Sequence, residues 1–311
     1  MPSKQRDSRH HSDAPGGPVD RIAELIAPLR VRPGTKVRLP RDFDPGHTGD
    51  LVNKRAGAEL LQRGVAMLAD YQARLAAEHR RGLLVVLQAL DAAGKDSTIR
   101  HVMSGVNPQG VRVHSFKVPS AEELDHDYLW RYAWRLPARG EIAIFNRSHY
   151  EEVLVVRVHP ALLDNEKLPP SVRTRDIWGH RFRAINEFER HLSETGFRIV
   201  KLFLNVSKDE QRKRLLQRID RPEKNWKFSA ADLQERQFWD DYQQAYSDML
   251  SNTSTEWAPW YVIPADHKWF ARIAAAATIV HALMELDPQF PSPDPQARRE
   301  LAQFRRALEE E

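Results

Sequence analysis

The chain has 311 residues, 41% of them hydrophobic and 29% charged, which is enough apolar material for one large domain or two small ones. Its 47 Lys and Arg residues against 43 Asp and Glu leave a formal charge of +4, too small for overall charge alone to indicate nucleic acid. The absence of cysteine excludes disulfides, iron–sulfur clusters and cysteine nucleophiles, so any metal must use oxygen or imidazole ligands.

The two ends of the chain differ in composition from its middle. Residues 1–20 are rich in Ser, Pro, Gly and charge, and we expect them to be disordered because they hold too little apolar surface to offset ordering entropy. They lack the apolar core of a secretory signal, and no uninterrupted apolar run of about 18 residues follows, so we expect a cytoplasmic protein without a membrane partner. A Pro-rich connector and a charged helix are expected over residues 288–311.

The middle of the chain alternates helical and strand patterns. Apolar spacings of three and four predict a long packing helix over residues 54–79, and the continuous run Leu83–Leu87 then predicts a strand buried on both faces. The same patterns predict strands at 111–116, 142–145, 199–204 and 260–263, and helices at 121–134, 176–194 and 270–286. This alternation predicts a three-layer α/β/α domain with a parallel sheet over residues 21–287.

Residues 207–252 are highly charged and helical in pattern, and they predict a helical lid that projects from the sheet. From Lys208 to Lys227 there are eight basic residues against four acidic ones. Arg214 and Arg218 share one helix face and can follow an extended polyanion, although a solvated charged face is the alternative. We expect Trp226 to brace the lid, with stacking on a base as the alternative.

The most specific motif follows the first buried strand, at residues 89–98 (ALDAAGKDST). A strand, a Gly-Lys turn and a helix together are typical of a P-loop, in which backbone N–H groups and the helix N-terminus bind phosphate. Gly94 lets the backbone approach phosphate, and Lys95 adds a mobile positive charge. An ordinary helix N-cap is the alternative. The residues assigned to phosphate are Ala92, Ala93, Gly94, Lys95, Asp96, Ser97 and Thr98.

This turn departs from the usual P-loop pattern in three places. Ala89 replaces the first Gly, and Asp96 replaces the Ser or Thr after the Lys, so Ser97 or Thr98 is expected to supply the metal-facing hydroxyl. Asp91 places a carboxylate beside phosphate, which costs electrostatic energy unless a cation lies between them. We therefore expect Asp91 to organise Mg²⁺, with Mn²⁺ as a further option and N-capping as the alternative role.

Polar residues also follow the strand at 142–145. In an open α/β sheet Asn146 and Arg147 reach the same edge as the P-loop. Arg147 offers a planar fork of donors to phosphate oxygens, and its alternative is a structural salt bridge with Glu151 or Glu152. The candidate catalytic residues are Asp91, Lys95, Asn146 and Arg147.

Several segments in the same order resemble the family 2 polyphosphate kinases. They are residues 90–99 (LDAAGKDSTI), 103–110 (MSGVNPQG), 116–119 (FKVP), 127–131 (DYLWR), 137–140 (PARG), 144–154 (IFNRSHYEEVL) and 220–229 (DRPEKNWKFS). The resemblance covers roughly residues 41–287. Such enzymes are P-loop kinases that exchange phosphoryl groups between polyphosphate and nucleotides with Mg²⁺, with polyphosphate in a basic channel under a helical lid.

The resemblance implies reversible transfer between inorganic polyphosphate and AMP or ADP. Asn146 is neutral where larger branches carry Asp, so the chain resembles the branch that accepts both nucleotides. Asn146, Arg147 and Glu151 are then expected to bind the nucleotide, which is adenine-based with guanine as a further option. The residues expected at polyphosphate, with solvated surface charges as the alternative, are Lys117, Arg131, Arg214, Arg218, Lys224 and Lys227. A homo-oligomer, dimer or tetramer, is also expected, and nucleic acid is not.

Two other functions remain open from the residues. One is a kinase of the same architecture that uses ATP as donor and a nucleoside or nucleotide as acceptor, since the fold alone does not specify the donor. A non-catalytic polyanion-binding protein with a basic lid would show steep salt dependence instead.

Overall fold

One parallel sheet lies at the centre of the computed structural model, which describes residues 18–49 and 54–311. The strand order is β2-β3-β1-β4-β5, and every neighbouring pair is parallel. Each strand begins and ends within two residues of its predicted range. The strands are β1 (Gly82–Ala89), β2 (Val111–Ser115), β3 (Ile142–Asn146), β4 (Phe197–Asn205) and β5 (Trp260–Pro264).

Helices connect the strands. In the first half they are α1 (Pro18–Ile26), α2 (Lys54–Glu78), α3 (Lys95–Val102), α4 (Ala121–Asp125), α5 (Trp130–Ala133) and α6 (Val155–Val158). In the second half they are α7 (Ile177–Glu194), α8 (Lys208–Asp220), α9 (Pro222–Asn225), α10 (Ala230–Glu235), α11 (Trp239–Thr253), α12 (Lys268–Leu286) and α13 (Pro295–Glu309). Short 3₁₀ segments are η1 (Ala27–Leu29), η2 (Pro108–Gly110), η3 (His149–Val153), η4 (Pro160–Glu166) and η5 (Arg236–Phe238).

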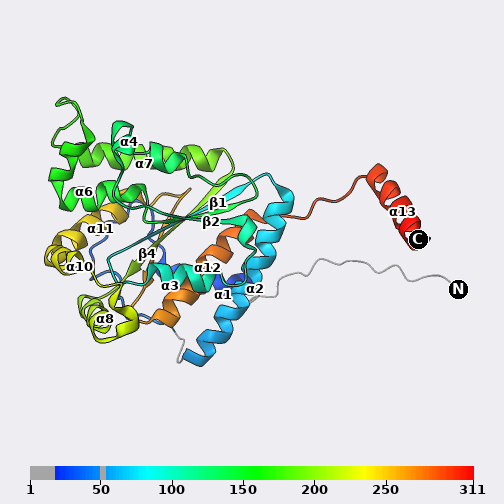
Figure 1. Ribbon diagram of the computed structural model, residues 1–311, viewed down its shortest axis with the longest axis horizontal. Coiled ribbons are helices and arrows are strands. Elements are labelled where there is room, and N and C mark those ends of the chain that lie inside the picture. The colour runs from blue at the N-terminus through cyan, green and yellow to red at the C-terminus, as the bar shows by residue number, and fades with distance from the viewer. Residues whose placement is uncertain (1–17, 50–53) are drawn as a thin grey trace.

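The sheet separates two apolar cores. Leu83, Val85 and Leu87 of β1 point into a core shared with α1, α2, α3 and α12. Leu84 and Val86 point to the opposite face, into a core shared with α7 and α11. Figure 1 shows these two groups of helices on either side of the sheet. The predicted three-layer α/β/α fold is confirmed.

Three predicted boundaries differ from the structure. Helix α1 begins at Pro18, so the predicted tail is shorter, and its residues 1–17 lie outside the described residues. The helix predicted at 121–134 is divided into α4 and α5, because His126 is extended and the Asp127 side chain accepts a hydrogen bond from the Leu129 N–H. Helix α11, predicted as lid, packs into the second core, so the lid comprises α8 to η5.

Helix α12 is apolar along its length. Among the described helices it alone is long and apolar enough to cross a membrane by length and composition, and 67% of that segment is buried inside the fold. Most of its residues between Phe270 and Leu283 belong to the first core. This burial is what a central core helix requires.

The register of the sheet brings several polar strand ends together. Asn146 lies opposite both Leu87 of β1 and Ser115 of β2, and Ala89 lies opposite Leu204 of β4. Because all strands run in one direction, their carboxyl ends meet at one edge. This edge carries the predicted phosphate-binding turn.

A fully buried ion pair lies behind that edge. Lys201 of β4 donates to Glu189 Oε2 at 2.6 Å, to Tyr150 Oη at 2.8 Å and to the Thr253 carbonyl at 2.6 Å. These acceptors use all three N–H donors of the ammonium group. The Lys201 Nζ also lies 5.3 Å from the ring centres of Tyr150 and Trp260. The network fixes η3, which directly follows the polar end of β3.

We predict that Lys201→Met lowers the free energy of unfolding by about 3–5 kcal/mol, because the buried carboxylate of Glu189 loses its lysine partner and keeps only its contacts with Tyr150 and His149. Urea unfolding measures this loss. The exposed Lys36→Met should change stability by less than about 0.5 kcal/mol, and Lys201→Met with Glu189→Leu should recover much of the loss. Equal stability of the single and double variants would contradict this account.

Candidate active site

The predicted phosphate-binding turn joins β1 to α3. Ala92 and Gly94 have positive φ angles of 60° and 112°, so the backbone turns sharply at both positions. The N-cap residue of α3 is Gly94, which has no side chain with which to cap the helix. The alternative of an ordinary side-chain N-cap is therefore wrong, and the first N–H groups of α3 remain available to an anion.

Lys95 is the first residue of α3. Its Nζ donates to the Ala89 carbonyl at 2.7 Å, and the side chain lines a cavity above the turn. Burial lowers the pKa of Lys95, and the positive charge of Arg147 lowers it further. A bound anion would reverse this effect, because it favours the protonated amine.

Arg214 of α8 holds the turn from the side of its carbonyl groups. Its guanidinium donates to the carbonyls of Ala92 and Ala93 in the turn, and to those of Ala265 and Asp266 after β5. Its Nε donates to Glu210 at 2.8 Å. These bonds use all five N–H donors. Arg214 therefore adds positive charge behind the turn, while its direct contact with polyphosphate remains a prediction.

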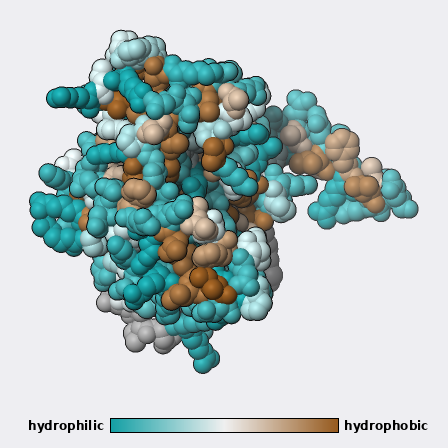
Figure 2. Space-filling model, turned by 60° about the vertical axis from the view of Figure 1, so that its left-hand side comes forward, coloured by the Kyte–Doolittle hydropathy of each residue, from teal (hydrophilic) through white to brown (hydrophobic). Residues whose placement is uncertain are grey.

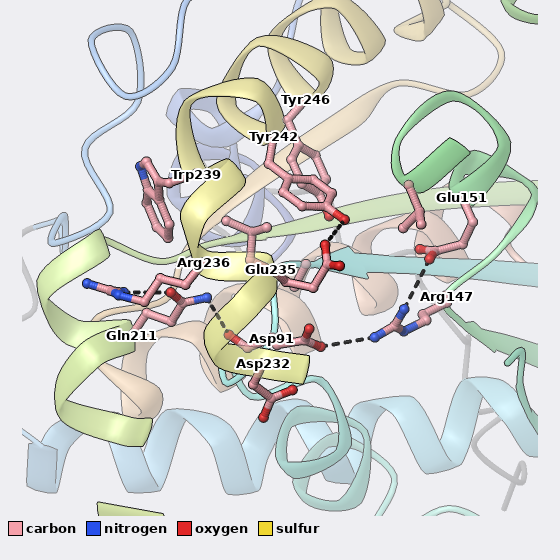
Figure 3. Close-up of a pocket in the computed structure, with 13 residues that line it drawn as sticks. Asp91, Arg147, Glu151, Gln211, Asp232, Glu235, Arg236, Trp239, Tyr242 and Tyr246 are labelled. Carbon is pink, nitrogen blue, oxygen red and sulfur yellow. Dashed lines mark hydrogen bonds and ion pairs between the residues drawn. The ribbon is translucent and has the colours of Figure 1, made fainter. Parts of the chain in front are cut away.

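Arg147 connects the turn to the end of β3. It has a positive φ of 63°, and its guanidinium forms ion pairs with Asp91 at 3.0 Å and Glu151 at 3.2 Å (Figure 3). The negative charge of Glu151 is the main reason that the pKa of Arg147 lies above its ordinary value. Glu152 pairs with Arg181 instead, at 3.6 Å. The Arg147 side chain is 38% exposed, and the carboxylates of Asp91 and Glu151 fix the position of its positive charge.

Asn146 lies between the turn and β2. Its Nδ2 donates to Asp96 at 2.8 Å and weakly to Ser115 at 3.4 Å, while its Oδ1 is buried without a partner in the part of the chain that the structure describes. Ser97 lines the cavity and accepts a hydrogen bond from Arg272, whereas Thr98 is buried. Of the two predicted hydroxyls, Ser97 is therefore the one that faces the cavity.

A cavity of about 610 Å³, which we term the phosphate cavity, lies over the phosphate-binding turn at this edge. Basic side chains from the sheet edge, the lid and α12 outnumber its two carboxylates, those of Asp91 and Asp96. The basic residues are Lys95, Lys117, Arg147, Arg214, Arg218, Lys224, Lys227 and Lys268. Such an excess of positive charge favours an extended polyanion.

A second cavity of about 220 Å³, which we term the aromatic cavity, adjoins the first. Phe116, Tyr128 and Tyr132 contribute to its walls. Four residues line both cavities: Phe116, Lys117, Val118 and Arg147. The positive charges of Lys117 and Arg147 therefore stand at the junction.

Arg131 supports this junction from behind. It is 8% exposed, pairs with Glu123 at 3.2 Å and donates to the Lys117 carbonyl at 2.9 Å. Its guanidinium also lies 5.4 Å from the ring centres of Phe116 and Tyr132. These contacts place Arg131 in the wall of the aromatic cavity, and its predicted contact with polyphosphate stays a prediction.

The lid contacts the phosphate-binding turn through a small third cavity of about 30 Å³ (Figure 3). Gln211 of α8 donates to the Asp91 carbonyl at 3.0 Å and accepts from Arg236 at 2.7 Å. Asp232 of α10 accepts from Arg218 at 2.6 Å. Burial and the neighbouring charge of Asp91 raise the pKa of Asp232. The lid is therefore closed over the turn in this structure.

The far end of the lid carries exposed charge. Lys224 and Lys227 line the phosphate cavity, and Lys227 Nζ lies 4.9 Å from the ring centre of Trp226. The Trp226 ring is 78% exposed. The expectation that Trp226 braces the lid is wrong, because a bracing ring would be buried against it.

The comparisons with known proteins agree with this geometry. The family model described as polyphosphate kinase 2 matches residues 51–291. The chain belongs to this polyphosphate kinase family. The motif resemblance, which covered residues 41–287, is confirmed.

Individual relatives of this kinase align over most of their own length. An ADP-polyphosphate phosphotransferase of Rhodopseudomonas palustris is 52% identical over 284 residues, which are 90% of this chain and 97% of that protein. An AMP/ADP-polyphosphate phosphotransferase of Meiothermus ruber is 48% identical over 266 residues, 85% of this chain and 95% of that protein. The crystal structure of polyphosphate kinase 2 from Arthrobacter aurescens TC1 has a TM-score of 0.79 and 43% identity, and covers 88% of this chain and 94% of that one.

Lys268 is a residue of the kinase site that sequence analysis missed. It begins α12, lines the phosphate cavity and lies in no recognised motif. Burial lowers its pKa to about 8, with contributions from the positive charges of Arg214 and Lys224. The only signal in the sequence was a basic residue shortly after a buried strand.

We predict that the affinity for inorganic triphosphate falls as the pH rises through about 8 in the unmodified kinase. Below this pH the Lys268 amine is protonated and attracts the anion, and above it the amine is neutral. Lys268→Arg keeps its charge and should remove this part of the pH dependence. Titration calorimetry at constant ionic strength from pH 6.5 to 9.5 checks this. Identical pH profiles for the two proteins would exclude a role for Lys268.

Proposed function

We propose that this kinase reversibly transfers phosphoryl groups between inorganic polyphosphate and AMP or ADP. The observation that carries the proposal is the pair of joined cavities, one basic and one aromatic, with Arg147 and Lys117 at their junction. A donor and an acceptor bound in these cavities would meet at the junction. The names of the relatives, which include both ADP and AMP/ADP enzymes, support the same pair of substrates.

The phosphate cavity suits polyphosphate. An unbranched chain of phosphates carries repeated negative charge and no base, so its recognition depends on many cations along an extended path. Lys224 and Lys227 of the lid line the same cavity as Lys95 and add two cations to such a path. A reactive phosphate would lie over the N-terminus of α3, where Lys95 and Arg147 can neutralise it.

The aromatic cavity suits the nucleoside part of the acceptor. Phe116 and Tyr128 contribute aromatic walls, with the buried Tyr132 packed against Phe116, while Asp127 and Asn165 offer polar groups to a base or ribose. Adenine is the proposed base, with guanine as a further option. The phosphate of the nucleotide would then reach Arg147, which also pairs with Glu151.

Transfer follows from this arrangement without a covalent enzyme intermediate. A terminal phosphate oxygen of AMP or ADP attacks the terminal phosphorus of polyphosphate, a new P–O bond forms, and the shortened polyphosphate leaves with the electrons of the broken bond. Lys95 and Arg147 stabilise the negative charge that is spread over the transferred group. Asn146 places no negative charge against either acceptor, which supports the use of both nucleotides.

A divalent cation completes the proposal, and Mg²⁺ or Mn²⁺ fits the residues present. Asp91 lines the phosphate cavity with a carboxylate, and the Oδ1 of Asn146 is a buried acceptor without a donor among the described residues. No group of three or more His, Asp or Glu in residues 18–49 and 54–311 is arranged to hold a metal by itself. Phosphate oxygens would therefore supply the remaining ligands, and the bound cation would offset phosphate charge.

Two further expectations go with this function. A cytoplasmic location would give the kinase access to AMP and ADP, and it remains a prediction. A homo-oligomer also remains a prediction, and the exposed apolar face of α13 offers a surface for it.

We predict that the chain with polyphosphate, Mg²⁺ and AMP forms ADP and ATP, followed by ³¹P NMR. Lys95→Ala should lower kcat at least about 100-fold, because it removes a cation from the transferred phosphate. Lys36→Ala, an exposed lysine outside the cavities, should retain full activity. Activity with ATP and a nucleoside but none with polyphosphate would favour the ATP-dependent kinase. Lys95→Ala without effect on any activity would favour a polyanion-binding protein.

Charge reversal in the lid should separate two kinds of basic residue. Lys224→Glu with Lys227→Glu should raise KM for long polyphosphate about tenfold or more, with a smaller effect on short chains and on ADP, because these lysines line the phosphate cavity but not the aromatic cavity. Arg214→Gln should impair both substrates, since Arg214 holds the turn itself. Arg212→Glu, on the same lid but outside the phosphate cavity, is the control. Equal loss for both substrates in the Lys224 and Lys227 variant would contradict this division.

A further inference from the structure

Helix α13 stands apart from the catalytic domain. Figure 1 shows it at the end of an extended segment, beyond the layers of the sheet. This segment, residues 287–294, contains three prolines that favour a stiff, extended spacer. The family model ends at residue 291, so α13 lies outside the part of the chain that defines the family.

One face of α13 is apolar and uncovered. Ala297, Leu301, Phe304 and Leu308 follow one another at spacings of four, three and four, which is the repeat of a coiled-coil seam. Leu301, Phe304 and Leu308 are 57%, 63% and 70% exposed. Figure 2 shows apolar surface on this detached helix. Apolar side chains in such a row normally pack against a partner.

The helix has its own start signal. Asp294 caps it by accepting a hydrogen bond from the Ala297 N–H at 2.8 Å, and Pro295 occupies the first helical position. Arg305 pairs with Glu309 one turn later at 2.8 Å. A helix of 15 residues is nevertheless close to the lower limit of stability in isolation. A packing partner would therefore stabilise α13 substantially.

We propose that α13 pairs in parallel with α13 of a second copy of this chain. In heptad terms, Leu301 and Leu308 occupy position a, and Ala297 and Phe304 occupy position d. The seam then contains only apolar side chains from both copies. Its length of two heptads makes it an addition to an assembly rather than a strong dimer by itself.

The charges beside the seam select the parallel direction. Glu300 occupies position g, and Arg298 and Arg305 occupy position e. In a parallel pair, Glu300 of each copy faces Arg305 of the other, which gives two attractive contacts. In an antiparallel pair, Arg298 of each copy would face Arg305 of the other, and their positive charges would repel each other. The pattern therefore favours two parallel helices over two antiparallel ones.

The charge balance also argues against a membrane surface as the partner. Residues 295–311 contain four arginines and four glutamates, so the segment is neutral overall. Helices that lie on membranes usually carry a polar face rich in Lys and Arg, which binds anionic lipids. A balanced set of charges beside an apolar seam is typical of helix pairing instead.

The absence of cysteine makes the pairing directly testable in the full chain. Ala297→Cys places a thiol at position d, where the same residue of a parallel partner faces it, so mild oxidation should give a covalent dimer. Ala302→Cys makes the same substitution on the outer face and is the matched control. We expect at least about tenfold more dimer from Ala297→Cys on non-reducing gels, because a disulfide needs Cα atoms within about 7 Å.

Further substitutions in the Ala297→Cys background test the seam and its charges. Phe304→Glu should reduce cross-linking to the control level. Glu300→Arg should reduce it partly, and Glu300→Arg with Arg305→Glu should restore it. None of these residues belongs to the catalytic site, so activity should be unchanged. Equal cross-linking of Ala297→Cys and Ala302→Cys would overturn the proposal, and so would cross-linking that Phe304→Glu does not reduce. Loss of the cross-link when the protein binds anionic vesicles would also overturn it, because the apolar face would then bind a membrane surface.

Discussion

The arrangement of the whole site depends on the guanidinium of Arg214. Its five N–H donors connect three segments that are distant in the sequence: the phosphate-binding turn, the first lid helix and the end of β5. Arg214 binds the carbonyls of Ala92 and Ala93, and these bonds stabilise the turn in which Ala92 and Gly94 have left-handed backbone conformations. Bonds to one planar group thus couple the position of the lid to the shape of the turn.

Arg147 is the point at which the cavities meet, and its position is determined from behind the sheet edge. Ser148, the next residue, accepts a hydrogen bond from buried Gln88 at 3.1 Å, and Tyr150 binds the buried Lys201. The positive φ of Arg147 is compatible with these fixed neighbours. Burying an ion pair costs free energy. The buried pair of Lys201 and Glu189 lies behind Arg147, the residue whose backbone has the unusual conformation.

Sequence reasoning predicted the elements and most of the residues that line the phosphate cavity, because both leave local signals. Buried strands appear as continuous apolar runs, and Lys95 lies in a motif. Lys268 has no such signal, since it reaches the phosphate cavity only through the position of β5 beside β4. Periodicity placed Arg214 on the same face as Arg218, but the carbonyls that occupy it come from distant loops. Side-chain contacts of this kind depend on tertiary structure, which spacing alone does not encode.

The strand order also has a consequence for how the protein is made. β1 lies between β3 and β4, and β4 is synthesised more than one hundred residues after β1. Parallel pairing between such distant segments is slow, because long loops must close before the contacts form. Until then the eight residues of β1, all buried in the final fold, remain exposed on the growing chain. The nascent kinase is therefore prone to aggregation until β4 pairs with β1, and chaperones would protect it during this interval.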